Sequence, residues 1–229
     1  MIRRKASIWV PFLLCVFKVF TCSHYSTSVY LNCHSHFSLN YGVLSLEELT
    51  DVLALHQIKR AALTDINNTS GVFDFVKLCR LKGIAPIVGV DFRKADYAHR
   101  FIALAKNNEG FNEINRYLSL CLATQNLELP LPEWQDVWVV YPYSDTADYS
   151  RLLSHEYVGV AHHQLTRLRY MRNLPIHKAV AWQAVTFTHK NHFHLHRLLR
   201  AIYSNELLSK MPPTQYAFVE QNTFLPPEQ

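Results

Sequence analysis

Short runs of β-branched and aromatic residues alternate with longer amphipathic stretches along most of this 229-residue chain, and this alternation limits the folds it can adopt. The apolar runs that we expect to be strands cover 29–34, 60–65, 86–92, 100–105, 137–142, 157–161 and 179–187. The amphipathic stretches that we expect to be helices cover 44–58, 71–83, 109–123 and 188–205. Strands that alternate with helices favour a parallel, barrel-like sheet. The sequence therefore predicts an α/β protein built from seven strand–helix units.

The composition excludes several classes of protein. The chain has six glycines and no Gly-x-Gly-x-x-Gly motif after any expected strand, which argues against a dinucleotide-binding or P-loop fold. Its five cysteines are odd in number and show no Cys-x-x-Cys spacing. This argues against a disulfide framework and a structural zinc site, and it is typical of a reducing compartment.

The first 28 residues differ from the rest of the chain. A basic start, MIRRK, and a short apolar run resemble a signal peptide, but Lys18 interrupts the run and no good cleavage site follows. One interpretation is a secreted binding module. The other, which we favour, is a cytoplasmic protein without a membrane segment, whose native start lies near Val29. Residues 1–28 would then be a signal-like leader that arose from a misassigned start.

Four metal-ligand side chains lie near the ends of the first three expected strands. His34 and His36 are two residues apart, so in an extended strand both would point to the same face. Asp65 follows the second strand and Asp91 lies near the end of the third. Because functional residues of barrels gather at the carboxyl ends of strands, these four could form a hydrolytic metal site. The alternatives are a turn or helix-cap role for Asp65 and a salt bridge for Asp91.

A second histidine pair lies in the last expected helix. His192 and His196 are one helical turn apart and could bind a metal ion together. The same helix carries an apolar face, and its histidines spread around the axis, so a packed or solvated helix is the alternative that we favour.

Four segments carry a resemblance to a known family: HSHFSLNYG, AALTDINNTSGVFDF, GIAPIVGVDF and FIALAKNNEGFNEINRYLS. They resemble the PHP (polymerase and histidinol phosphatase) domain, in the form found at the amino terminus of the bacterial DNA polymerase III alpha subunit. LAKNNEGFNEINRYLS and the closing NTFLPPEQ are typical of the polymerase branch. The resemblance implies a distorted TIM-like (β/α)7 barrel of the PHP type over 29–212. It also implies that 213–229 is a linker into a polymerase palm domain.

The family's metal-binding pattern is only partly present. His34, His36 and Asp65 match it, and Asp91 stands where the family usually has the longer Glu. The positions at which a usual ligand is replaced are Tyr41, Ile66, Arg100, Ala184 and Thr186. His99 is one residue from the position of a usual histidine ligand, and strand alternation predicts that it faces the other way. The pattern indicates a degenerate site that holds no metal, or one zinc or manganese ion weakly.

The resemblance also implies partners and a function. The family's full chain is a DNA-directed DNA polymerase that uses magnesium in its palm, and this chain contains no palm, so whether it is an enzyme is left open. We expect a fragment with a structural or docking role in DNA replication. Its partners would be the remainder of the alpha chain, a proofreading exonuclease, and DNA through the full-length protein. The alternative is an independent metal-dependent phosphoesterase.

Overall fold

The computed structural model describes residues 29–165, 174–217 and 222–224, so the leader at 1–28 lies outside the described residues. The strands are β1 (Val29–Cys33), β2 (Arg60–Leu63), β3 (Ala85–Arg93), β4 (His99–Ala105), β5 (Val137–Pro142), β6 (Glu156–Val160), β7 (Ala179–Ala181) and β8 (Ala184–Val185). The α-helices are α2 (Leu46–Leu55), α3 (Val72–Leu81), α4 (Asn108–Ala123) and α6 (Lys190–Ser204).

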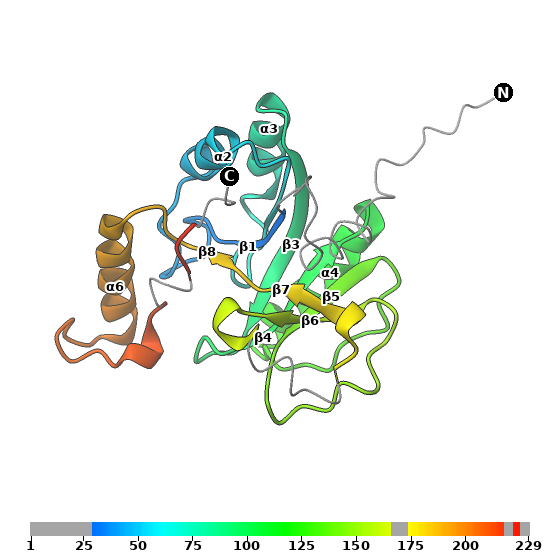
Figure 1. Cartoon of the computed structure of the whole chain (residues 1–229). Coiled ribbons are helices and arrows are strands. Elements are labelled where there is room, and N and C mark those ends of the chain that lie inside the picture. The colour runs from blue at the N-terminus through cyan, green and yellow to red at the C-terminus, as the bar shows by residue number, and fades with distance from the viewer. Residues whose placement is uncertain (1–28, 166–173, 218–221, 225–229) are drawn as a thin grey trace.

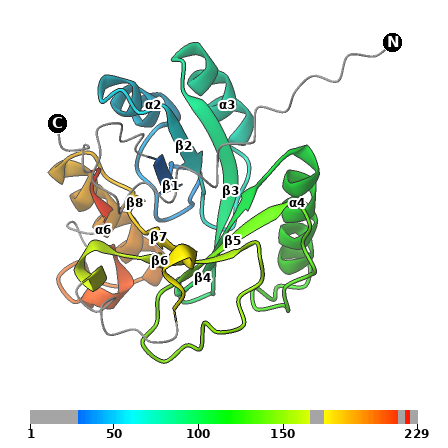
Figure 2. The same cartoon turned by 45° about the vertical axis from the view of Figure 1, so that its right-hand side comes forward.

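All eight strands belong to one curled sheet, in the order β7-β6-β5-β4-β3-β2-β1-β8. Its two edge strands, β7 and β8, are consecutive in the chain and separated only by Trp182 and Gln183. The sheet therefore bends back until its two edges approach each other, with α2, α3 and α4 on its outer side (Figures 1 and 2). This is the distorted TIM-like α/β barrel that the sequence predicts.

The parallel arrangement expected for every strand holds except at β4. This strand runs antiparallel to both β3 and β5. The turn of residues 94–98 joins β3 to β4 without a helix, and a short turn can connect only antiparallel neighbours. The expected strand at 179–187 is also divided, because β7 pairs with β6 and β8 pairs with β1.

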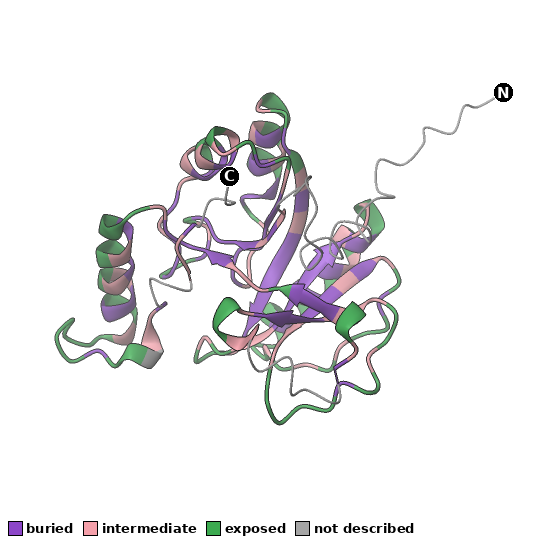
Figure 3. Cartoon of the chain, viewed as in Figure 1, coloured by how far each residue is buried: buried purple, intermediate pink, exposed green. Residues whose placement is uncertain are grey.

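Two-residue alternation along the strands separates the inside of the barrel from its helix-covered outside. The inner cluster of buried residues consists of Ala62, Ile87, Ile102, Leu104, Val140 and Val180. Their neighbours in sequence, such as Leu63 and Phe101, pack outward against the helices. Buried residues therefore line both faces of the sheet (Figure 3).

Local signals fix the ends of the helices. The Ser45 hydroxyl accepts a hydrogen bond from the Glu48 N–H and begins α2, and the Asn107 side chain accepts one from the Gly110 N–H and begins α4. After α3, Gly83 adopts φ +68°, a left-handed conformation that glycine takes without strain. These caps turn the chain back toward the sheet.

The described part of the carboxyl-terminal segment packs on the barrel. Phe224 is buried in the cluster under α2 and α3, with its ring centroid 5.0 Å from that of Tyr30. The Asn222 carbonyl accepts hydrogen bonds from the N–H groups of Thr186 and Phe187. The described residues include no helix that is long and apolar enough to cross a bilayer.

Candidate metal centre

Four neighbouring parallel strands, β8, β1, β2 and β3, bring polar residues to one rim of the barrel. Thr186 directly follows β8, His34 directly follows β1, Asp65 comes two residues after β2, and Asp91 lies near the end of β3. All four are buried. The structure thus places His34, Asp65 and Asp91 at the ends of three adjacent strands.

His34 uses both ring nitrogens in contacts with the protein. Its Nε2 lies 3.0 Å from Asp91 Oδ2, and its Nδ1 lies 3.0 Å from Thr186 Oγ1. Burial lowers the pKa of His34, although its hydrogen bond to Asp91 opposes that shift. A neutral His34 that donates from Nε2 to Asp91 and accepts from Thr186 satisfies both contacts, and neither nitrogen then has a lone pair for a metal ion.

Asp91 is the most heavily contacted carboxylate of the rim. The Arg93 Nε donates to Asp91 Oδ2 at 2.8 Å, and the Arg93 Nη2 lies 2.8 Å from the same oxygen. The other oxygen, Oδ1, is 3.2 Å from Nδ1 of His99. Burial alone would raise the pKa of Asp91, but Arg93, His99 and His34 outweigh it and hold the pKa well below its usual value. Asp91 is therefore an ionised partner of an arginine.

Arg93 and Tyr41 fill the space next to this carboxylate. The Arg93 Cζ lies 4.5 Å from the centroid of the Tyr41 ring, the distance of a cation–π contact. Tyr41 also meets the His34 ring edge-on, with centroids 5.7 Å apart. Although burial would lower the pKa of Arg93, Asp91 raises it, so the guanidinium stays charged. The sequence showed Tyr41 only as a replaced ligand and gave no role to Arg93.

Asp65 holds the turn that follows β1. Its Oδ1 accepts from the Ser35 N–H and the Ser38 hydroxyl, both at 2.7 Å, and its Oδ2 accepts from the Ser35 hydroxyl at 2.8 Å. Burial raises the pKa of Asp65, and these three hydrogen bonds oppose the shift. Both oxygens are thus engaged in shaping residues 35–38, which is a turn role like the alternative stated for this residue.

His36 points away from the other three predicted ligands. Its side chain is exposed, and its Nδ1 lies 3.2 Å from the carbonyl oxygen of Leu44. β1 ends at Cys33, so His34 directly follows the strand and His36 lies in the turn after it, and neither belongs to the extended strand. The two-residue alternation that predicted a common face therefore does not apply to them.

The expected orientation of His99 is wrong. The pairing Phe92–Phe101 is followed by Arg93–His99, so Arg100 is an extra residue, a β-bulge that shifts the alternation by one. His99 consequently faces Asp91, while Arg100 turns outward and donates to Tyr117 and to the carbonyls of Leu127 and Leu129. Arg100 is thus not on the rim, and Arg93 is the arginine in the centre.

The donor set does not fit a multinuclear metal centre. His34, Asp65 and Asp91 each use every ligand-type atom in protein contacts, and a guanidinium lies 2.8 Å from Asp91 Oδ2. Ile66 and Ala184, at two usual ligand positions, are buried and offer no donor side chain. A cavity of about 600 Å³ opens beside the centre and is lined by Arg93, His99 and Arg200 among others, but not by Asp65 or Asp91.

His192 and His196, the second predicted histidine pair, contact different partners. His196 is fully buried, its Nδ1 lies 2.6 Å from the Tyr41 carbonyl oxygen, and its Nε2 accepts from the Ala217 N–H at 2.9 Å. This fixes a neutral imidazole with its proton on Nδ1. His192 Nε2 instead faces Glu48 on α2, at 3.3 Å. His196 is a packed core histidine, in agreement with the favoured alternative of a packed helix.

The barrel and its rim define a class of protein, and comparison with known families assigns the chain to it. The profile of the PHP domain family matches residues 31–198, more than half of the chain. The chain belongs to the PHP domain family.

The curated relatives that the chain matches include DNA polymerase III alpha subunits and an error-prone DNA polymerase. The chain is 31% identical over 109 residues to the DNA polymerase III subunit alpha of Chlamydia muridarum, a match that covers 42% of this chain and 8% of the relative. It is 34% identical over 91 residues to the error-prone DNA polymerase of Symbiobacterium thermophilum, which covers 40% of this chain and 8% of that one. The matched region is thus a small part of each relative.

Solved structures give weaker likenesses. A proposed metal-dependent phosphoesterase from Bifidobacterium adolescentis aligns with a TM-score of 0.34 at 10% identity, over 78% of this chain and 84% of that one. An amidohydrolase from Chromobacterium violaceum aligns with a TM-score of 0.35 at 12% identity, over 77% and 84%. Likenesses this low carry no functional argument.

Proposed function

We propose that this chain is the amino-terminal PHP domain of a DNA polymerase III alpha-type protein, and that it acts in DNA replication as a structural and docking module. Its relatives support the assignment, because a PHP-matched region of this chain is similar to DNA polymerase III alpha subunits. The observation that carries the structural role is the Arg93–Asp91 pair, which puts a fixed positive charge in the centre where the family binds metal.

The charge of Arg93 explains why the centre is proposed to be degenerate. A dication beside Asp91 would have to displace the guanidinium from a fully buried site or be repelled by it. Metal-assisted hydrolysis needs an ion that binds and activates a water molecule. Arg93 neutralises Asp91 but offers no coordination position for water, so the chain is proposed to lack phosphoesterase activity.

Helix α6 supports the docking role because its polarity is reversed. The residues it buries against the barrel include His192, His196 and Arg200, spaced one helical turn apart. Leu195, Leu198 and Ile202 are instead exposed, at 46%, 47% and 66% of their surface. A helix normally turns its apolar stripe inward. An exposed stripe of this kind marks a protein contact, and we assign it to the remainder of the polymerase chain.

The domain limits follow from the same proposal. Residues 29–212 are the PHP domain, 213–229 lead toward the palm, and the native start lies near Val29. DNA would be contacted only through the full-length protein, which is proposed to be cytoplasmic. Mass spectrometry of the amino-terminal peptide in the native host tests the start. A mature terminus near residue 29 supports the proposal, whereas one at Met1, or a processed terminus in an exported fraction, contradicts it.

Phosphoesterase assays test the proposed loss of catalysis. Tag-free protein is incubated with zinc or manganese and two substrates, p-nitrophenyl phosphate and a DNA 3′-phosphate. We expect no hydrolysis above that of the Asp65→Asn variant, which removes a carboxylate of the family pattern. Hydrolysis that disappears with Asp65→Asn or His34→Gln would instead establish the independent metal-dependent phosphoesterase.

Co-purification tests the docking role. The genomic sequence downstream of the gene is read for a palm-coding frame, and the encoded polymerase body is co-expressed with this chain. Gln substitutions of Leu195, Leu198 and Ile202 should abolish co-purification. The matched control replaces three exposed apolar residues of α2 and α3 by Gln: Leu55, Phe73 and Leu81. If both triple variants co-purify equally well with the polymerase body, the assignment is contradicted. If the parent chain co-purifies with an exonuclease subunit and not with the polymerase body, the surface belongs to that partner.

A further inference from the structure

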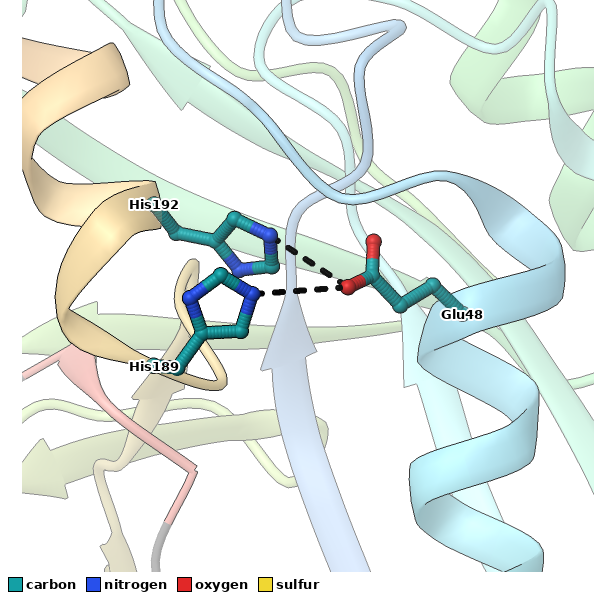
Figure 4. Close-up of side chains that lie close together, drawn as sticks. All are labelled: Glu48, His189 and His192. Carbon is teal, nitrogen blue, oxygen red and sulfur yellow. Dashed lines mark ion pairs between the residues drawn. The ribbon is translucent and has the colours of Figure 1, made fainter.

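A group of metal-ligand side chains lies between α2 and α6, outside the hydrogen-bond network of His34 and Asp91. Glu48 is in the first turn of α2, His189 is the N-cap residue of α6, and His192 lies in the first turn of that helix. Figure 4 shows both imidazoles directed at the same carboxylate oxygen. Among the described residues, this is the group of three whose ligand atoms all lie within 4.8 Å of one another.

The distances suit one small ion. Glu48 Oε1 is 3.3 Å from His192 Nε2 and 3.9 Å from His189 Nε2. A tetrahedral zinc ion with bonds of about 2.0–2.1 Å holds its ligand atoms roughly 3.3 Å apart, so only His189 has to shift. The two imidazole rings lie in contact, with centroids 3.6 Å apart and a tilt of 36° between their planes, and the ligand atoms of the three residues lie within 4.8 Å of one another.

Thr188 gives His192 the support that a metal-bound imidazole needs. The His192 Nδ1 lies 3.1 Å from Thr188 Oγ1, and it accepts a longer hydrogen bond from the Thr188 N–H at 3.4 Å. When Nε2 binds a metal the ring proton must sit on Nδ1, so metal binding would replace the contact with the N–H by donation to the hydroxyl, which would hold the ring in place. Burial lowers the pKa of His192, which favours the neutral imidazole that coordinates metals.

The exposure of the group leaves room for an ion and for water. The side chains of Glu48 and His189 are 38% and 51% exposed, whereas that of His192 is 11% exposed. An ion could therefore enter from solvent and keep a water molecule as its fourth ligand. Two imidazoles and one carboxylate select zinc or a similar transition metal over magnesium or calcium, which prefer oxygen ligands.

We propose that Glu48, His189 and His192 bind one zinc-type divalent ion that fastens the amino-terminal end of α6 to α2. The buried side of α6 is polar and is held by contacts such as His196 with Tyr41, so an additional clamp at its start would fix the direction of its exposed apolar face. The rival account is a simple ion pair between Glu48 and a protonated histidine, which would need no metal.

Cobalt and zinc titrations of the tag-free chain distinguish the two accounts. We expect the visible absorption of tetrahedral cobalt, displaced by one equivalent of zinc, and a thermal midpoint that rises with zinc. Glu48→Gln and His189→Asn change partly exposed side chains and should fold normally. Each should weaken zinc binding at least tenfold and remove the rise in midpoint.

Two matched controls locate the ion. His194→Asn removes an exposed histidine of the same helix and should bind zinc like the parent. His36→Asn removes the exposed histidine near the barrel centre and should do the same. Absence of binding at high micromolar zinc, or binding that Glu48→Gln and His189→Asn leave unchanged, would overturn the proposal. Loss of zinc binding with His36→Asn alone would place the ion at His36 and overturn the proposal equally.

Discussion

Arg93 is the residue on which the barrel's centre depends. It is 2% exposed, lies 2.8 Å from Asp91 and covers the Tyr41 ring. Two opposite charges that are both out of water are tolerated only as a pair, because each one alone would keep its full cost of desolvation. Arg93 and Asp91 therefore stabilise the rim together, and neither is expected to tolerate replacement alone.

Replacing Arg93 by Met should lower the free energy of unfolding by about 3–5 kcal/mol, because Asp91 is left charged and buried without its partner. Urea denaturation at neutral pH measures this loss. Arg80→Met, on the exposed side of α3, should change stability by less than about 0.5 kcal/mol. Adding Asp91→Asn to Arg93→Met should recover part of the loss, and a double variant less stable than the single one would contradict the pairing.

His196 should make the protein acid-sensitive. Burial lowers its pKa from 6.5 to about 4 in the folded protein. The folded state therefore excludes a proton that the unfolded state binds. The free energy of unfolding therefore has its full value, as far as His196 is concerned, above pH 6.5. It decreases by at most about 3 kcal/mol as the pH falls from 6.5 toward 4.

Urea denaturation of His196→Gln at several pH values between 7 and 4 checks this prediction. The variant should be less stable at neutral pH but lose less stability on acidification than the parent. His194→Asn, which changes an exposed histidine of the same helix, should keep the parent's pH dependence. Identical slopes in the parent and His196→Gln would show that His196 does not carry the effect.

At the scale of elements, the turn between β1 and α2 shapes the rim. The Gly42 N–H donates to the Ser38 carbonyl at 2.7 Å, and Asp65 binds Ser35 and Ser38 from the other side. A Cβ at Gly42 would overlap the carbonyl group of Ser35. This backbone cannot move aside without breaking the hydrogen bonds to Asp65.

Gly42→Ala should therefore destabilise the chain by about 1–3 kcal/mol, as expected for overpacking. Thermal denaturation measures the loss. Gly83→Asn is the matched control, because Gly83 has φ +68° and open space around it, and Asn tolerates that conformation. The control should stay within about 1 kcal/mol of the parent, and an equal loss in both variants would contradict the close approach at Gly42.

The sequence predicts elements better than it predicts the site. The apolar runs and amphipathic stretches locate the strands and helices to within a few residues, because periodicity depends on neighbours in the chain. The direction in which the His99 side chain faces depends on a bulge in β4, and no local sequence pattern predicts that bulge. The role of Arg93 had one local signal, because it lies two residues after Asp91 on the same strand. Glu48 and His192 come together only through the tertiary fold.

At the scale of the whole molecule, the PHP barrel combines a centre filled by its own arginine with an outward-facing apolar helix. The curled sheet brings β8 beside β1, which places Thr186 next to His34 and completes the rim without a metal ligand. Helix α6 presents Leu195, Leu198 and Ile202 to its surroundings. These two features are the ones on which the proposed structural and docking role rests.

Anomalous X-ray diffraction from crystals soaked in zinc and in manganese tests the central claim most directly, because it locates each ion. The arginine-filled centre predicts no anomalous peak beside His34, Asp65 or Asp91, with the Arg93 guanidinium on Asp91 in both soaks. A zinc peak at Glu48 would concern only the separate surface site. A zinc or manganese peak bound to His34 and Asp91, with Arg93 displaced, would contradict the claim.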